Sequence, residues 1–245
     1  MASRPILTAL AMPTTPKRFP ALLQSFAYLD CYVKWRPTAK FRDWALDSGA
    51  FTAFGANATI SLKDYTDRAR TLLEVDPKLV EVFSLDVIGD WRQGLKNCQA
   101  MWKAKVPAIP CFHYGEPDDL LLGLARDYPK IALGGMVGVS MPKKIAWAKD
   151  CVFKVWPKAV HGFGQGSRDS LLSVPWHSTD ASNWQIGPTR FGSWPNNMFG
   201  RRFSVPNSDS LDLRICVKYF LDLEDESRRR WANEMKEVDY VPHKV

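Results

Sequence analysis

The stretch that decides the fold is LVEVFSLDVIGDWRQGLKNCQAMWKAKVPAIPCFHY, residues 79–114. It opens with an apolar run, 79–88, continues with an amphipathic segment, 90–105, and closes with a second apolar run, 106–114. Asp90 stands directly before the amphipathic segment, where a helix N-cap is expected. A strand, a helix and a second strand at this spacing form a βαβ unit, in which the strands are parallel and the helix covers one face of the sheet.

The same alternation continues along the rest of the chain. Further apolar runs, each expected to be a strand, are 6–12, 44–51, 130–138, 159–164 and 172–180. Further amphipathic segments, each expected to be a helix, are 61–75, 116–128 and 140–156, with one or two more helices in 208–235. Ser61 is the expected N-cap of the first of these. Repeated strands and helices at this spacing predict a small or modified TIM-type (β/α)8 barrel. A doubly wound open sheet is the alternative, although no GxGxxG motif follows the first run.

The length and composition favour one sizeable core. With 245 residues, 46% of them hydrophobic, the chain is expected to be a single domain spanning 1–245, in which 205–245 supplies closing helices. No run approaches the roughly 20 apolar residues of a membrane span, and the N-terminal run indicates a strand rather than a secretion signal. We therefore expect a cytoplasmic protein without a membrane partner.

The five cysteines, Cys31, Cys98, Cys111, Cys151 and Cys216, lie far apart in the sequence. Without CxC or CxxC spacing, they are typical of a reducing compartment, where cysteine is a small buried apolar residue. The spacing argues against a clustered zinc motif, so a metal site would need ligands that only the fold brings together. We expect no metal and no cofactor from the sequence.

The formal net charge is +7, and it is unevenly distributed. Residues 1–45 hold seven Lys and Arg against two Asp, whereas 201–245 balance nine against nine. A basic, partly segregated surface suits a polyanion such as nucleic acid, although solubility alone explains it equally well.

Polar groups stand at or near the ends of most of the expected strands. In chain order they are Asp47, Asp86, His113, the pair Gly134 and Gly135, the segment HGFGQGS at 161–167, and Asp180. Each has an ordinary explanation alone, because aspartate favours turns and helix caps, glycine favours tight turns, and a histidine on an apolar strand is usually a core residue. Their repetition at equivalent positions predicts a functional site where the carboxyl ends of parallel strands meet.

The three carboxylates of this predicted site, Asp47, Asp86 and Asp180, suit acid–base and nucleophilic catalysis at an acetal-like carbon. An ionised carboxylate can attack an anomeric carbon while another group handles the proton of the leaving group. Backbone groups exposed by paired glycines can reach the edge of a planar base, and carboxylates accept hydrogen bonds from the N–H and NH₂ groups of guanine. With a basic surface, an N-glycoside in a nucleic acid becomes a coherent substrate.

Five short motifs together resemble the tRNA-guanine transglycosylase superfamily. They are DSGAF (47–51, where the family has DSGGF), SLD (84–86), ALGGMVG (132–138), HGFG (161–164) and STDASNW (178–184), in the order of the family. The short length, FHYGE and the TDASNW and GPTRFG segments look closer to the phage-type, DpdA-like DNA-guanine transglycosylases. The resemblance covers roughly 44–194 and implies exchange of guanine in DNA for a free 7-deazaguanine base. If the chain is phage-encoded, the expected location is the host cytoplasm.

The resemblance also implies roles for individual residues. Asp180 matches the nucleophile that attacks C1′, and Asp47 matches an acid that contacts the base and transfers protons. Asp86 matches the carboxylate that reads the N–H and NH₂ edge of the base. The remaining expected base contacts are Ser48, His113, Gly134, Gly135, Met136 and His161, with Gln165 as a weaker candidate. Lys34, Arg36, Arg190, Arg201 and Arg202 are candidate phosphate contacts.

The chain departs from the tRNA enzymes in two ways that favour duplex DNA with a flipped guanine as substrate. It has only Cys216 after Cys151, so it lacks the Cys-rich zinc subdomain of those enzymes, and it lacks the length used to grip a folded RNA. The alternatives are a tRNA-guanine transglycosylase, a nucleosidase or DNA glycosylase, and a non-catalytic nucleic-acid-binding barrel. The oligomeric state stays open, with a homodimer among the options.

Overall fold

The computed structural model describes residues 19–38, 40–182 and 213–242. It divides into two compact units, one comprising Met1–Gly135 with Tyr240–Val245 and the other Met136–Asp239. Each unit is a set of parallel strands connected by helices, which confirms the predicted parallel α/β class. The prediction of one domain over 1–245 stays a prediction.

The first unit holds the strands that carry most of the predicted site. A parallel sheet is formed, in this order, by β1 (Leu22–Ser25), β2 (Trp44–Asp47), β3 (Leu79–Phe83) and β4 (Ala108–Ile109). A second parallel pair is formed by β5 (Cys111–His113) and β6 (Lys130–Gly134). The helices of this unit are α1 (Leu29–Trp35), α2 (Ala50–Gly55), α3 (Leu62–Val75), α4 (Trp91–Lys103) and α5 (Asp118–Asp127), with short 3-10 turns at Phe26–Tyr28 and Arg36–Thr38.

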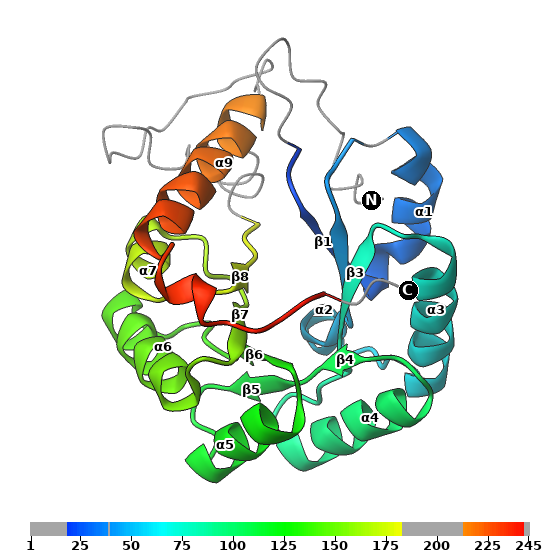
Figure 1. Cartoon of the computed structure of the whole chain (residues 1–245). Coiled ribbons are helices and arrows are strands. Elements are labelled where there is room, and N and C mark those ends of the chain that lie inside the picture. The colour runs from blue at the N-terminus through cyan, green and yellow to red at the C-terminus, as the bar shows by residue number, and fades with distance from the viewer. Residues whose placement is uncertain (1–18, 39, 183–212, 243–245) are drawn as a thin grey trace. The chain divides into compact units, whose positions relative to one another are not determined.

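The predicted starts of α3 and α4 are confirmed by their capping bonds. The Ser61 hydroxyl accepts a hydrogen bond from the Asp64 N–H at 3.2 Å, and the Asp90 carboxylate accepts one from the Gln93 N–H at 3.1 Å. Such side-chain caps satisfy N–H groups that the first turn of a helix leaves unpaired. Helix α3 packs beside β3, and α4 packs beside β4 (Figure 1). The side chain of Tyr65 on α3 is fully buried.

An ion pair is buried inside the first unit. Lys130 at the start of β6 has no exposed side-chain surface, and its Nζ lies 2.6 Å from an Oε1 of Glu81 on β3. The ring of Tyr240 lies 5.1 Å from the same Nζ. Burial lowers the pKa of Lys130, and Glu81 opposes that effect by stabilising the charged form.

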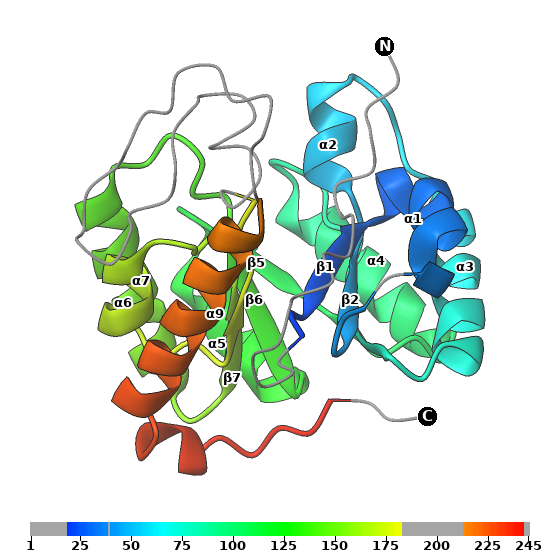
Figure 2. The same cartoon turned by 90° about the horizontal axis from the view of Figure 1, so that it is seen from above.

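The second unit contains the parallel pair β7 (Ala159–Gly162) and β8 (Ser178–Thr179). Its helices are α6 (Met141–Val155), α7 (Arg168–Ser173) and α9 (Leu213–Arg230), followed by a 3-10 turn at Glu234–Lys236. Helix α9 lies beside α7 (Figures 1 and 2), where Ser227 and Trp231 both donate hydrogen bonds to the carbonyl of Leu171. The predicted C-terminal helix is confirmed over 213–230, whereas its closing of a barrel stays a prediction; residues 205–212 lie outside the described residues.

Two of the predicted strands differ from the structure, and one lies outside its described residues. The predicted strand at 6–12 lies outside the described residues, and the first described strand, β1, was not predicted. A single strand over 106–114 is wrong, because Pro110 divides it into β4 and β5. A strand over 172–180 is also wrong, because 172–173 belong to α7 and only Ser178–Thr179 are extended in a ladder. No helix among the residues that the structure describes is long and apolar enough to cross a membrane.

Candidate functional site

The DSG motif forms a tight turn between β2 and α2. Asp47 is the last residue of β2, and its carboxylate accepts a hydrogen bond from the Gly49 N–H at 3.0 Å. Gly49 has a φ of 78°, and a Cβ at this position would lie 2.8 Å from the Ser25 hydroxyl. Glycine is therefore required here by both conformation and space. The turn buries Ser48 and leaves Asp47 half-buried at the end of the strand.

Asp86 lies in the loop that follows β3, three residues beyond the last strand residue, Phe83. One of its oxygens accepts a hydrogen bond from the Ser48 hydroxyl at 3.3 Å, and the other lies 2.8 Å from Nε2 of His113. The structure thus joins three of the predicted site residues, Ser48, Asp86 and His113, in one network. A carboxylate held on both oxygens has a fixed orientation.

His113, the last residue of β5, is held from its other side by Glu116. Its Nδ1 lies 3.1 Å from one Glu116 oxygen, and its backbone N–H donates to the other oxygen at 2.7 Å. Only 15% of the His113 side chain is exposed, against 19% for Asp86 and 14% for Glu116. The imidazole is therefore fixed in a largely buried position between two carboxylates.

This environment changes the protonation of His113. Burial disfavours the imidazolium, but interactions with Cys111, Asp86 and Glu116 outweigh it and raise the pKa of His113 well above its ordinary value. Burial of the Cys111 thiol raises its own pKa to about 11, so this group is a neutral thiol at pH 7. The two carboxylates beside the ring favour the protonated form of His113 even when Cys111 is a neutral thiol.

The glycine pair at the end of β6, Gly134 and Gly135, packs directly against His113. The Gly134 carbonyl accepts a hydrogen bond from the Tyr114 N–H at 3.1 Å. Gly135 has a φ of 72°, and a Cβ there would lie 2.9 Å from the His113 Cβ and 3.1 Å from the Tyr114 nitrogen. Only glycine allows the backbone to come this close to His113.

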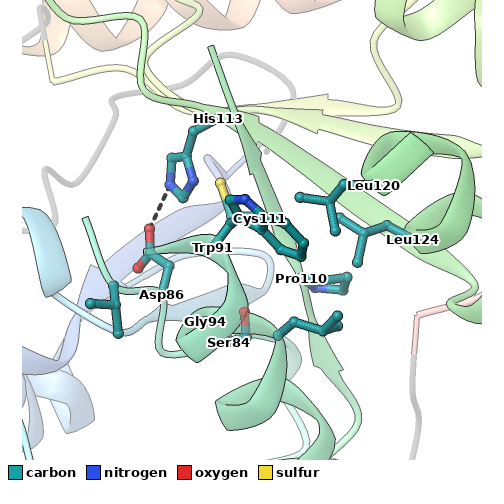
Figure 3. Close-up of a pocket in the computed structure, with 11 residues that line it drawn as sticks. Ser84, Asp86, Trp91, Gly94, Pro110, Cys111, His113, Leu120 and Leu124 are labelled. Carbon is teal, nitrogen blue, oxygen red and sulfur yellow. Dashed lines mark hydrogen bonds and ion pairs between the residues drawn. The ribbon is translucent and has the colours of Figure 1, made fainter. Parts of the chain in front are cut away.

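A pocket opens beside Asp86, Cys111 and His113 (Figure 3). Its other lining residues are Ser84, Val87, Trp91, Gly94, Leu95, Pro110, Leu120 and Leu124. The cavity volume is about 10 Å³, which is close to the room that one water molecule needs. A purine base would therefore have to bind outside this cavity.

In the second unit, Asp180 follows β8 directly. Its Oδ1 accepts a hydrogen bond from the Gly164 N–H at 2.9 Å and lies 3.4 Å from Nε2 of His161. Nδ1 of His161 lies 2.9 Å from the Ser178 hydroxyl. Asp180 is thus tied to the loop after β7. Its side chain is 25% exposed, against 5% for His161.

The loop after β7 is held by a chain of buried polar groups. Trp176 donates to the Ser170 hydroxyl at 3.2 Å, and Ser170 donates to the Gln165 carbonyl oxygen at 2.8 Å. The amide nitrogen of Gln165 in turn lies 3.5 Å from the sulfur of Met136. Met136, one of the predicted base contacts, is 4% exposed and packs inside this unit.

The five predicted phosphate contacts differ in what the structure shows of them. Arg190, Arg201 and Arg202 lie outside the described residues. Lys34 is exposed in the last turn of α1. Arg36 makes two hydrogen bonds of 3.0 Å to the Asp76 carboxylate and stacks 4.6 Å from the centre of the Phe41 ring, so its guanidinium has a structural role.

Cys111, Glu116 and the His161 partner Ser178 were missed as members of these networks. Two of them leave a signal in the sequence. Cys111 and His113 are two residues apart in an apolar run, which places both side chains on one face of a strand. Glu116 follows His113 by three residues in HYGE, a spacing that a tight turn closes.

Comparison with protein-family models gives no match to the chain, and comparison with curated proteins gives none either.

Proposed function

We propose that the chain is a DNA-guanine transglycosylase, which exchanges guanine in DNA for a 7-deazaguanine base through a covalent aspartyl-glycosyl intermediate. The observation that carries the proposal is the setting of Asp180 at the end of β8. Among the described residues, the contacts of its carboxylate to Gly164 and His161 both use Oδ1. No contact to Oδ2 is found within the described part of the chain, so we assign this oxygen the role of nucleophile while Oδ1 keeps the side chain oriented.

The proposed reaction has two displacements at the same carbon. A deoxyguanosine is first flipped out of the duplex, at a cost of a few kcal/mol. Oδ2 of Asp180 then attacks C1′, the bond from C1′ to N9 breaks, and guanine leaves with the bonding electron pair and takes up a proton. In the second displacement, N9 of the 7-deazaguanine loses its proton and attacks C1′, releasing Asp180. One N-glycosidic bond replaces another, so the exchange is close to balanced in free energy.

The network of the first unit is proposed to hold the base. Asp86 can accept hydrogen bonds from the N–H and NH₂ groups of guanine, since a carboxylate has about four acceptor positions and Ser48 and His113 use two of them. Asp47 is proposed to transfer protons to and from the base. The backbone beside Gly135 is proposed to contact the substituent of the incoming base. As part of this proposal, the strands close into a small (β/α)8 barrel, which the parallel pairing within each unit supports.

The test is incorporation of a labelled 7-deazaguanine base into duplex DNA. Asp180→Ala is expected to lower incorporation by roughly 10³-fold or more, because the nucleophile is lost. The matched control is Asp169→Ala, which removes an exposed carboxylate from α7 of the same unit and should leave incorporation unchanged. Wild-type incorporation by a folded Asp180→Ala variant would refute the assignment.

The product separates the proposal from its rivals. Abasic sites formed without added base would identify a glycosylase, in which water resolves the intermediate. Binding without a covalent adduct on a denaturing gel would identify a non-catalytic nucleic-acid-binding protein. Labelling of tRNA in preference to DNA, when both are offered together, would reassign the polymer.

A further inference from the structure

Three potential metal ligands meet in the first unit although they are dispersed in the sequence. Ligand atoms of Asp86, Cys111 and His113 all lie within 4.8 Å of one another. Cys111 and His113 alternate with Phe112 along β5, so both side chains point to the same face of the strand. Figure 3 shows the Cys111 sulfur beside the His113 ring, with Asp86 facing the ring from the loop after β3.

The histidine has the outer partner that metal-bound histidines usually have. Its Nδ1 lies 3.1 Å from the Glu116 carboxylate, while Nε2 faces Asp86. A carboxylate on one ring nitrogen fixes the tautomer and the orientation of the ring, and leaves the other nitrogen for the metal. Glu116 is itself held in place, because it also accepts the backbone N–H of His113 at 2.7 Å.

The site has room for an ion after a small movement. In a tetrahedral zinc site with bonds of about 2.0–2.1 Å, neighbouring ligand atoms lie about 3.3 Å apart. The present separation of 2.8 Å between Nε2 of His113 and the Asp86 oxygen must therefore open by about 0.5 Å, which rotation of a carboxylate can supply. The adjoining cavity of about 10 Å³ gives room for one water as the fourth ligand.

We propose that Asp86, Cys111 and His113 bind a Zn²⁺ ion, with Glu116 as the outer partner of the histidine and a water molecule as the fourth ligand. Thiolate and imidazole ligands favour zinc over magnesium or calcium, which prefer oxygen ligands alone. On binding, the ion replaces the thiol proton of Cys111 and the proton between Nε2 and Asp86, and both protons pass to the solvent without any redox change. This site goes beyond the proposed base exchange and does not depend on it, although zinc and a base would compete for Asp86.

The first test is an isothermal calorimetric titration of the full chain with Zn²⁺ alone. One ion per chain is expected. Cys111→Ser is expected to weaken zinc binding by more than about 100-fold, because a direct ligand is lost. Glu116→Gln is expected to weaken it by about 10–100-fold, because His113 stays a ligand and loses only its outer partner. Cys31→Ser removes an exposed cysteine that is not one of the three proposed ligands, and this variant should bind Zn²⁺ with the affinity of the wild type. Circular dichroism verifies that each variant is folded. Equal affinity of wild type and folded Cys111→Ser would overturn the proposal.

A second test uses only the wild-type chain, so it holds even where a variant fails to fold. Zn²⁺ is expected to protect Cys111 from alkylation by iodoacetamide, as read by mass spectrometry of peptides, while exposed Cys31 is alkylated at the same rate with and without the ion. Co²⁺ in place of zinc should produce a thiolate-to-cobalt charge-transfer band. Unchanged alkylation of Cys111 at a zinc concentration that saturates the chain would overturn the proposal.

Discussion

Replacement of Gly135 by alanine tests the close approach between the glycine pair and His113. The added Cβ would lie 2.9 Å from the His113 Cβ and 3.1 Å from the Tyr114 nitrogen, and both of these atoms belong to or adjoin the backbone. The left-handed conformation of Gly135 costs an alanine about 1–2 kcal/mol, and the steric overlap adds about 1–3 kcal/mol. We expect Gly135→Ala to lower the free energy of unfolding by about 2–5 kcal/mol.

Gly89→Ala is the matched control, because it separates the two contributions. Gly89 has a φ of 84°, close to the 72° of Gly135, but nothing lies within 4 Å of a Cβ built on it. Its replacement should cost only the conformational part, about 1–2 kcal/mol. Urea denaturation of both variants gives the comparison, and the same samples are assayed for base incorporation, which Gly135→Ala should reduce by displacing His113 from Asp86. Equal losses of stability in the two variants would refute the close contact.

Three further predictions concern charged residues of the first unit. Asp76→Asn should lower the free energy of unfolding by about 1–3 kcal/mol at pH 7, because it removes the partner of Arg36. Burial opposes ionisation of Asp76, but hydrogen bonds led by that from Arg36 outweigh it and lower the pKa of Asp76. The stabilisation is therefore present above about pH 4 and is lost as the pH falls through the folded-state pKa, so urea denaturation curves of wild type and variant should converge in acid. Lys34→Ala should leave stability unchanged and reduce the slope of log K for DNA against log salt by about 1; an unchanged slope would exclude a phosphate contact. Lys130→Met leaves Glu81 buried without its counter-charge and should cost about 3–5 kcal/mol in thermal denaturation. Addition of Glu81→Gln should recover most of that loss, and additive losses would contradict a direct pair.

The parts of the fold that the sequence predicts best are those with two independent signals. Helices α3 and α4 have a 3.6-residue apolar period together with a side-chain cap, Ser61 or Asp90, and both caps form the expected hydrogen bonds. The ends of β2 and β6 are marked by Asp47 and the Gly134–Gly135 pair. In each case local chemistry, rather than tertiary packing, sets the boundary.

The parts that the sequence misses depend on packing. A short apolar run does not distinguish strand from helix, which is why the predicted strand over 172–180 includes the last two residues of α7. β1 is a four-residue strand with only half-buried side chains, so it has no strong period. The triad of Asp86, Cys111 and His113 spans several elements, and no spacing rule reports ligands that meet only after the chain has folded.

The proline between β4 and β5 has a consequence for how the first unit opens. Pro110 has no N–H to give to a ladder, yet its carbonyl accepts a hydrogen bond from the Ala132 N–H at 2.9 Å, while the carbonyl of Ile109 accepts one from Ser84 at 2.8 Å. Two adjacent carbonyl groups, those of Ile109 and Pro110, therefore connect the β3–β4 pair to the β5–β6 pair. We therefore expect the hydrogen bonds between β3 and β4 and those between β5 and β6 to open together, as one cooperative unit. Hydrogen–deuterium exchange should then give the same free energy of opening for the amides of Ser84 and Ala132.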